Sequence, residues 1–258
     1  MGAAVAQSLA NAGARLFLTG HNRGPVQITA EKILASGGIA EVDVVDAMDE
    51  NAIGNHIHRV VQDVGTLDIS FNAIGSEVVQ NMPLIDMTVD DFIKPVSFAM
   101  RTQFLTATAA AKKMMLQGSG VILCLTATPG GIGYPYTGGF GPACSAVECF
   151  VRNLASEIGM YGVRVINIRS AGSPDSKVFQ DAIINHSEVM KNVIGKMESD
   201  TMLKKLPLME DIANVAVFLS SGMAAKITGV TVDVTCGTTA GLNYRVPAVS
   251  GGRSNITL

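Results

Sequence analysis

Residues 120–150 read GVILCLTATPGGIGYPYTGGFGPACSAVECF, and this stretch decides the fold class. An apolar, β-type run over 120–128 leads into a glycine-rich loop, and apolar residues then recur at helical spacing over 141–160. A short apolar run bounded by turn residues is typical of a strand that is covered on both faces. The stretch therefore predicts a buried strand, a loop and an amphipathic helix in succession.

The same alternation of strand and helix extends in both directions along the chain. We expect further helices over 2–12, 25–36, 49–64, 90–116, 175–200 and 209–221, and further strands over 15–20, 40–45, 67–75, 163–171 and 229–235. Apolar strands that alternate with helices are typical of a parallel sheet covered by helices on both faces. The pattern predicts one doubly wound α/β domain over 1–240 and a loop-like tail over 241–258, packed on the surface or on a neighbouring subunit.

The composition restricts the class of function. The 258 residues are 48% hydrophobic and 16% charged, which suits a sizeable core, and the net charge of −3 offers no broad basic field for nucleic acid or an anionic membrane. No apolar run reaches ~18 residues and no basic leader precedes one, so we expect neither a membrane span nor a signal peptide. The four cysteines, none in C-x-x-C spacing, predict buried free thiols in a reducing cytoplasm and no metal site: Cys124, Cys144, Cys149 and Cys236.

A series of landmarks in fixed order resembles the short-chain dehydrogenase/reductase family. The series is GAAVAQSLANAGA (2–14), RLFLTG (15–20), VDVVD (42–46), LDISFNAIG (67–75), GSGVILCLTAT (118–128), GVRVINI (162–168) and ITGVTVDV (227–234). The resemblance implies a single-domain Rossmann fold that binds NAD or NADP. It also implies hydride transfer to or from a carbonyl, an alcohol or an activated alkene, usually by a homodimer or homotetramer.

The glycine-rich cofactor loop of the family, T-G-x-x-x-G-x-G, is matched only at its last glycine, by Gly2. The strand that precedes this loop lies at the centre of the family's sheet, and we expect it to be missing from this chain. Two explanations remain open: Met1 is an internal residue of a longer protein, or nucleotide binding has been lost. We favour the first, because deleting a central strand leaves buried backbone groups unpaired.

Other cofactor positions follow from the resemblance. Asp43 matches the aspartate that contacts adenine in the family, although a structural role as a turn or helix-terminal aspartate is the alternative. Asn72 and Gly75 match the first and last residues of the family's N-N-A-G, in which the second Asn is replaced by Ala73. The segment GHNRG (20–24) lacks the acid that binds the ribose 2′-OH of NAD. Arg23, with His21, could pair with a 2′-phosphate, so we expect NADP in preference to NAD, although a solvated surface charge is the competing interpretation of Arg23.

The family's catalytic Asn, Ser, Tyr and Lys are all replaced. The aligned positions are Ala99, Ala127, Phe140 and Cys144, and FGPACSAVE (140–148) aligns with the family's Y-x-x-S-K-A-A-V-E without a gap. A carbonyl that accepts hydride develops negative charge on oxygen and needs a proton or a strong hydrogen-bond donor. None of the four side chains supplies one in the usual way, so the standard mechanism cannot operate through these positions.

Two tyrosines in the glycine-rich loop could substitute for the missing acid. Tyr136 lies four residues before Phe140, and Tyr134 lies two residues earlier. Thr126 and Thr128 flank the aligned serine position, but on an extended strand they should point to the opposite face. Tyr136 is therefore the stronger candidate for a catalytic role.

Arg169 is the second catalytic candidate, because it ends an apolar strand at the edge where this fold binds ligands. Its guanidinium could hold a carboxylate, a phosphate or an oxyanion. The alternative is a salt bridge to Asp175 or to a neighbouring subunit, and Asp175 itself suits a helix N-cap. His56 and His58 are two apart, diverge on a helix and predict no metal pair.

Three functions remain open at this point. The first is an oxidoreductase, NADP-linked and with a non-standard site, for which reduction of an enone places least demand on a tyrosine. The second is a catalytically silent member that acts as a binding or oligomer partner. The third is a non-redox enzyme that uses Tyr136 and Arg169 in the former substrate cleft.

Overall fold

The structure is a computed structural model that describes residues 1–75 and 77–241. Its helices are α1 Gly2–Asn11, α2 Arg23–Ala35, α3 Glu50–Val64, α4 Val89–Gln117, α5 Phe140–Ile158, α6 Lys177–Asn185, α7 Ser187–Asp200 and α8 Met209–Ser220. Its strands are β1 Arg15–Gly20, β2 Ile39–Val44, β3 Ile69–Asn72, β4 Gly120–Ala127, β5 Val163–Ser170 and β6 Thr231–Val234. The strict alternation that the sequence predicts over its first two-thirds is therefore present, and the expected tail over 241–258 falls almost wholly outside the described residues.

The strands form two parallel sheets. Four strands pair in the order β3-β4-β5-β6, and β1 pairs with β2 in a separate two-stranded sheet. The longest ladder runs from Gly120 opposite Val163 to Ala127 opposite Ser170. Because parallel strands in register end at the same edge, the segments that follow β3, β4, β5 and β6 gather at one end of the larger sheet.

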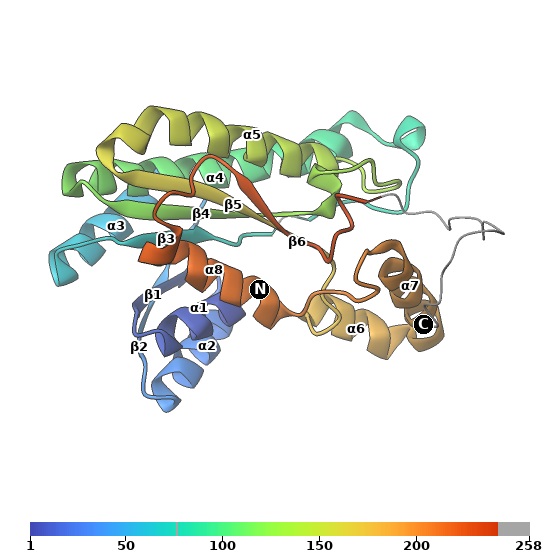
Figure 1. The fold of residues 1–258 in the computed structure, drawn as a ribbon, viewed down its shortest axis with the longest axis horizontal. Coiled ribbons are helices and arrows are strands. Elements are labelled where there is room, and N and C mark those ends of the chain that lie inside the picture. The colour runs from blue at the N-terminus through green and yellow to red at the C-terminus, as the bar shows by residue number, and fades with distance from the viewer. Residues whose placement is uncertain (76, 242–258) are drawn as a thin grey trace, which may run out of the picture.

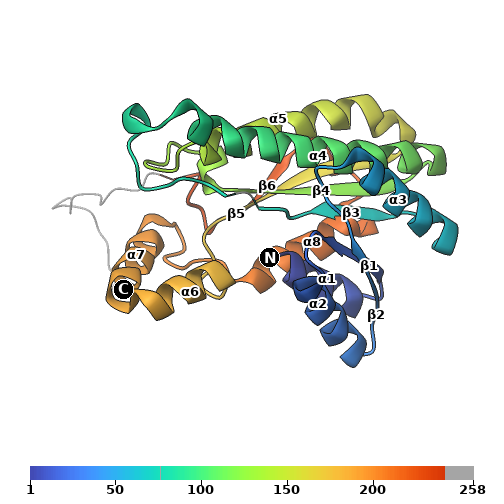
Figure 2. The same cartoon turned by 180° about the vertical axis from the view of Figure 1, so that it is seen from behind.

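Helices cover both faces of the larger sheet (Figures 1 and 2). Alternate residues of a strand point to opposite faces, so Ile122 and Cys124 of β4 pack with apolar residues of α3, α4 and α5. Leu123 packs on the other side, with residues of α1 and α8. These two apolar layers explain the near-continuous hydrophobic strands and fix the carboxyl edge of β4 rigidly between them.

The two sheets share a core but no hydrogen bonds. Within the described residues β1 pairs only with β2 and β3 only with β4. Leu9 of α1 lies in one apolar cluster with Leu16 of β1 and with Ile69 and Phe71 of β3. No residue of β1 is fully buried, whereas most of β5 is. Within the described residues, β1 and β3 therefore each have one edge without a strand partner.

The segment that the sequence predicts to be helical, 175–200, is helical but divided in two. The segment forms two helices, α6 and α7, that meet at His186, whose φ of −144° and ψ of 51° are not helical. Asn185 and Ser187 flank the break, and such side chains compete with helix hydrogen bonds. Neither helix buries a residue fully, and the pair stands apart from the sheet in Figure 1.

Candidate functional site

Ala127, Phe140 and Cys144, three of the positions that the sequence predicts to replace catalytic residues, lie on β4 and on the start of α5. Ala127 is the last residue of β4, and Phe140 is the first residue of α5 after the intervening loop. Cys144 lies one turn further along α5 and is buried. Ala99 of α4 packs against the cluster beneath. Ala127, Phe140 and Cys144 thus bring no exposed hydroxyl or ammonium group to this edge of the sheet.

Cys144 is a buried, protonated thiol. Burial raises its pKa to about 11, and the negative charge of Glu148 adds to this, against an opposing contribution from the backbone of Ala127. A thiol with such a pKa is neither a cation nor a nucleophile near neutral pH. Cys144 therefore offers no substitute for a lysine at this position.

Arg169 is held by two carboxylates. Its Nε and Nη2 donate to Glu148 of α5 at 2.9 and 2.6 Å, and its Nη1 donates to both oxygens of Asp233 on β6 at 2.9 and 3.0 Å. Hydrogen bonding to Glu148 raises the pKa of Arg169, so the guanidinium stays charged. The salt bridge to Asp175 that we considered is wrong, because the partners are Glu148 and Asp233.

Further polar groups complete this ion-pair network. Thr126 donates from its hydroxyl to Glu148 at 2.9 Å and accepts from the amide of Asn167 at 2.7 Å. Thr126 thus faces Arg169 and not the side of Ala127, as strand alternation predicts. The loop after β4 covers the network closely, since a Cβ on Gly131 would lie 2.6 Å from the Arg169 guanidinium. All three nitrogens of this half-buried guanidinium are engaged, and its four hydrogen bonds leave at most one of its five N–H groups, on Nη2, for a substrate oxyanion.

The loop after β5 carries two further polar groups. Asp175 accepts from the backbone N–H of Met209, the first residue of α8, at 3.1 Å. It therefore caps a helix, as the sequence suggested, but the helix is α8 and not the one that follows it directly. Ser173 is buried, and its Oγ has no hydrogen-bond partner among the described residues.

The two candidate tyrosines are exposed on the loop between β4 and α5. Tyr134 is 40% exposed and Tyr136 is 57% exposed. Tyr136 precedes the helix, so it does not share a helical face with Phe140. Its backbone adopts a left-handed conformation with φ of 60°.

Asp43 is engaged by two basic side chains of α3. It accepts from Nδ1 of His56 at 2.9 Å and from Arg59 at 2.5 Å. Burial works to raise the pKa of Asp43, but these two bonds outweigh it and lower that pKa below its ordinary value. The carboxylate thus ties β2 to α3, and because Asp43 lies within β2 it is neither a turn nor a helix-terminal aspartate.

Arg23 and His21 lie at the carboxyl end of β1. Both are exposed, His21 contacts Asn22 through its ring at 3.0 Å, and Arg23 forms no ion pair within the described residues. Arg23 is the first residue of α2, where a phosphate would also meet the helix dipole. These residues can therefore reach an anion without breaking an existing contact.

Asn72 and Gly75 follow β3. Asn72 donates to the hydroxyl of Thr106 at 2.9 Å and accepts from the N–H of Ile74 at 3.0 Å, so it ties the end of β3 to α4. Gly75 has open space where a Cβ would lie, and at Gly2 a Cβ would meet only Ala73. The segment after β3 and the start of α1 therefore approach each other closely at the carboxyl edge.

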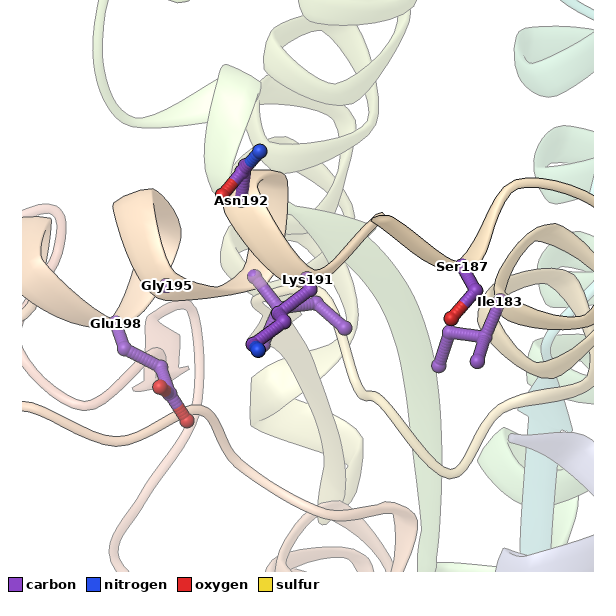
Figure 3. A pocket seen from close by; sticks show the side chains of 7 residues that line it. Ile183, Ser187, Lys191, Asn192, Gly195 and Glu198 are labelled. Carbon is purple, nitrogen blue, oxygen red and sulfur yellow. The ribbon is translucent and has the colours of Figure 1, made fainter. Parts of the chain in front are cut away.

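A hollow lies along α6 and α7 (Figure 3). Its volume is about 680 Å³, and it is lined by Ile183, Ser187, Lys191, Asn192, Ile194, Gly195 and Glu198. None of the residues that the sequence singles out lines it. A second hollow, of about 550 Å³, lies at the opposite, amino edge of the sheet beside Arg164.

The partners of Arg169 and Asp43 were not predicted from sequence: Glu148, Asp233, His56 and Arg59. Cys124 and Cys144 are buried as expected, but Cys149 is exposed and Cys236 is only half-buried. The described residues contain no cluster of side chains suited to a metal ion and no helix long and apolar enough to cross a membrane.

Known proteins resemble this chain over nearly its whole length. The family described as enoyl-(acyl carrier protein) reductase matches residues 1–239. A 2,3-dihydro-2,3-dihydroxybenzoate dehydrogenase of Bacillus subtilis is 26% identical over 245 residues, 94% of this chain and 93% of that protein.

Two solved structures share the fold. The crystal structure of levodione reductase superposes with a TM-score of 0.85 and 26% identity, over 93% of this chain and 94% of its own. A gluconate 5-dehydrogenase of Burkholderia cenocepacia, solved in complex with NADP and tartrate, superposes with a TM-score of 0.82 and 20% identity, over 93% of this chain and 91% of its own.

Proposed function

Because the chain belongs to the short-chain dehydrogenase/reductase family, we propose that it is an NADP-linked oxidoreductase that reduces an activated carbon–carbon double bond. The observation that carries this proposal is the absence of an exposed proton donor at the catalytic positions. Ala127 and Phe140 are apolar, and the thiol of Cys144 is buried with a pKa of about 11. The description of the matching family as an enoyl reductase supports the same type of substrate.

NADP fits the groups available at the carboxyl ends of β1 and β5. Arg23, exposed and without a carboxylate partner among the described residues, would hold the 2′-phosphate, with His21 beside it. The orphaned, buried Oγ of Ser173 is a hydrogen-bonding group that a ligand at the carboxyl edge could satisfy. When bound, the reduced cofactor would supply a hydride.

The chain's own residues would then bind and orient the alkene. Phe140 and Ala127 present an apolar surface at the edge of β4, which suits an uncharged, conjugated substrate. Hydride delivered to the β-carbon leaves an enolate, and solvent can protonate its α-carbon without a protein acid. Arg169 stays within its ion-pair network and holds α5 against β5 and β6.

The open edges of β1 and β3 bear on cofactor binding. We propose that a further parallel strand between them would complete the sheet, because both edges carry backbone groups without sheet partners and already share one apolar cluster. Such a strand would also place a loop at the start of α1, where backbone N–H groups favour phosphate. Any sequence encoded upstream of Met1 and in frame therefore belongs in the binding experiment.

The test is a titration with NADPH, followed by its oxidation in the presence of 2-cyclohexen-1-one. We expect Arg23→Ala to weaken NADPH binding about tenfold, as for loss of one charge-assisted contact, and to leave binding of NADH unchanged. Lys32→Ala, an exposed cation later on the same helix, is the matched control. Absence of binding at millimolar NADPH, with any upstream strand present, would refute the proposal.

A catalytically silent binding or oligomer partner is the second candidate function. The observation that favours it is that Glu148 and Asp233 engage all three nitrogens of Arg169, which leaves this charged candidate little capacity to bind a substrate. The same observation weighs against the third hypothesis, a non-redox enzyme that relies on Arg169.

The proposal also keeps three expectations from the sequence. These are assembly as a homodimer or homotetramer, a cytoplasmic location, and a domain that extends to residue 240.

A further inference from the structure

Two non-glycine residues with left-handed backbones are hydrogen-bonded to each other. The N–H of Asn81 donates to the carbonyl of Tyr136 at 2.8 Å, and their φ angles are 63° and 60°. Asparagine tolerates this conformation, whereas for a bulky aromatic residue it is an outlier. We call this pair the Asn81–Tyr136 clasp.

Close backbone packing beside the clasp maintains the strain. Two residues after Tyr136, a Cβ on Gly138 would lie 2.7 Å from the carbonyl oxygen of Val79, and a Cβ on Gly139 would overlap the carbonyl of Phe92. The loop after β4 is therefore pressed against the segment after β3, with room only for glycine. Such surroundings hold a residue in an unfavourable conformation that it would otherwise leave.

The side chain of Tyr136 contributes little packing to the fold. It is 57% exposed, and its hydroxyl makes no hydrogen bond within the described residues. Glycine at this position would relieve the strain and lose little packing. Backbone strain that side-chain packing does not offset is typical of functional positions.

The clasp lies at the edge of the sheet where a ligand would bind. Asn81 follows β3 and Tyr136 follows β4, and these strands are parallel neighbours. Figures 1 and 2 show the two segments together at one end of the larger sheet. The same loop begins after Ala127 and ends at Phe140, the apolar surface of the candidate site.

We propose that Tyr136 is a specificity-determining residue and that the clasp positions its ring as a wall for a planar, conjugated substrate. This inference rests on the proposed function and extends it to the choice of substrate. The ring supplies contact area with few rotatable bonds, and its hydroxyl is not required as an acid. The role differs from the catalytic one that the sequence suggested for the same residue.

The test compares three substitutions by the KM for 2-cyclohexen-1-one with saturating NADPH. Tyr136→Ala removes the ring and should raise KM about tenfold with kcat changed less than about twofold, the loss expected for one aromatic contact. Tyr136→Phe keeps the ring and should stay within about twofold in both. Tyr161→Ala removes an exposed tyrosine at the opposite edge of the sheet and should change neither.

Tyr136→Gly adds a readout that is independent of activity. It removes the same ring as Tyr136→Ala but relieves the left-handed strain, so its unfolding equilibrium constant should be about threefold to tenfold lower than that of the alanine variant. Its KM should nevertheless match the alanine variant. Equal stability of the two variants, or an unchanged KM in both, would overturn the inference.

The outcome for the wild type separates this inference from the proposed function. If the protein binds NADPH and reduces the enone while Tyr136→Ala is without effect, the inference fails and the function stands. If the wild type does not bind NADPH, both fall.

Discussion

Replacing Arg169 by methionine should destabilise the protein far more than replacing Asp233 by asparagine. Glu148 is 5% exposed, and without Arg169 its carboxylate keeps only the hydroxyl of Thr126. Removing one partner of a buried ion pair costs about 3–5 kcal/mol, because the remaining charge stays desolvated. Loss of Asp233, whose side chain is 38% exposed, should cost at most about 1 kcal/mol.

The assay is urea unfolding followed by circular dichroism, with the double variant Arg169→Met, Glu148→Gln included. We expect the double variant to recover at least about 2 kcal/mol relative to Arg169→Met alone, because no buried charge remains unpaired. If Arg169→Met costs no more than Asp233→Asn, or if the double variant is additive, the network is not a buried structural ion pair. Arg169 would then be free to serve a substrate.

Three further predictions follow from other contacts. Because the pKa of Asp43 is lowered in the folded state, its contribution to stability is present above about pH 4 and is lost as pH falls through the folded-state value. Asp43→Asn should therefore flatten the acid limb of a plot of unfolding free energy against pH. An unchanged acid limb would contradict this prediction. Iodoacetamide at pH 7.5 should label the exposed Cys149, as detected by mass spectrometry. Cys124 and Cys144 are buried and their pKa values are raised to about 12 and about 11, so both should stay unlabelled until urea is added. Labelling of Cys144 before urea is added would disprove its burial. Gly139→Ala should destabilise by more than about 2 kcal/mol because its Cβ would overlap the Phe92 carbonyl of α4. Gly54→Ala in the open middle of α3 should stabilise by about 0.5–1 kcal/mol in the same urea titration. Equal effects would refute the close packing of the loop after β4 against α4.

The alternation of apolar strands and amphipathic helices was sufficient to predict the architecture from sequence. β4 and β5 are continuous apolar runs because helices cover both of their faces, and that requirement is visible residue by residue. The division of 175–200 into α6 and α7 could not be predicted in the same way. Both helices are amphipathic, and only the polar residues around His186 signal the break.

The candidate site was predicted less completely, because its charged residues pair across distant segments. Arg169 and Asp233 each stand inside an apolar strand, and a charged residue in such a strand needs a partner. That signal could have paired them, since their strands are neighbours with these two residues in register. Glu148 was hidden because a glutamate on a helix is usually solvent-exposed, and only the structure reveals that it faces the sheet.

The left-handed backbone of Tyr136 was equally invisible in the sequence. Glycines at 138 and 139 mark a tight loop, but they do not reveal which neighbouring residue is strained. The strain arises from contact with the segment after β3, about fifty residues earlier in the chain. Local sequence patterns do not carry such long-range contacts.

The most direct test of the central claim compares two carbonyl compounds that differ in one double bond. With NADPH and any upstream strand present, we expect oxidation of NADPH with 2-cyclohexen-1-one and none above background with cyclohexanone. Reduction of the saturated ketone needs a proton donor at the developing alkoxide, and neither Ala127 nor Phe140 carries one, while the thiol of Cys144 is buried. Comparable rates with both compounds would contradict the account, because reduction of cyclohexanone would require an acid at the site beyond Ala127, Phe140 and Cys144.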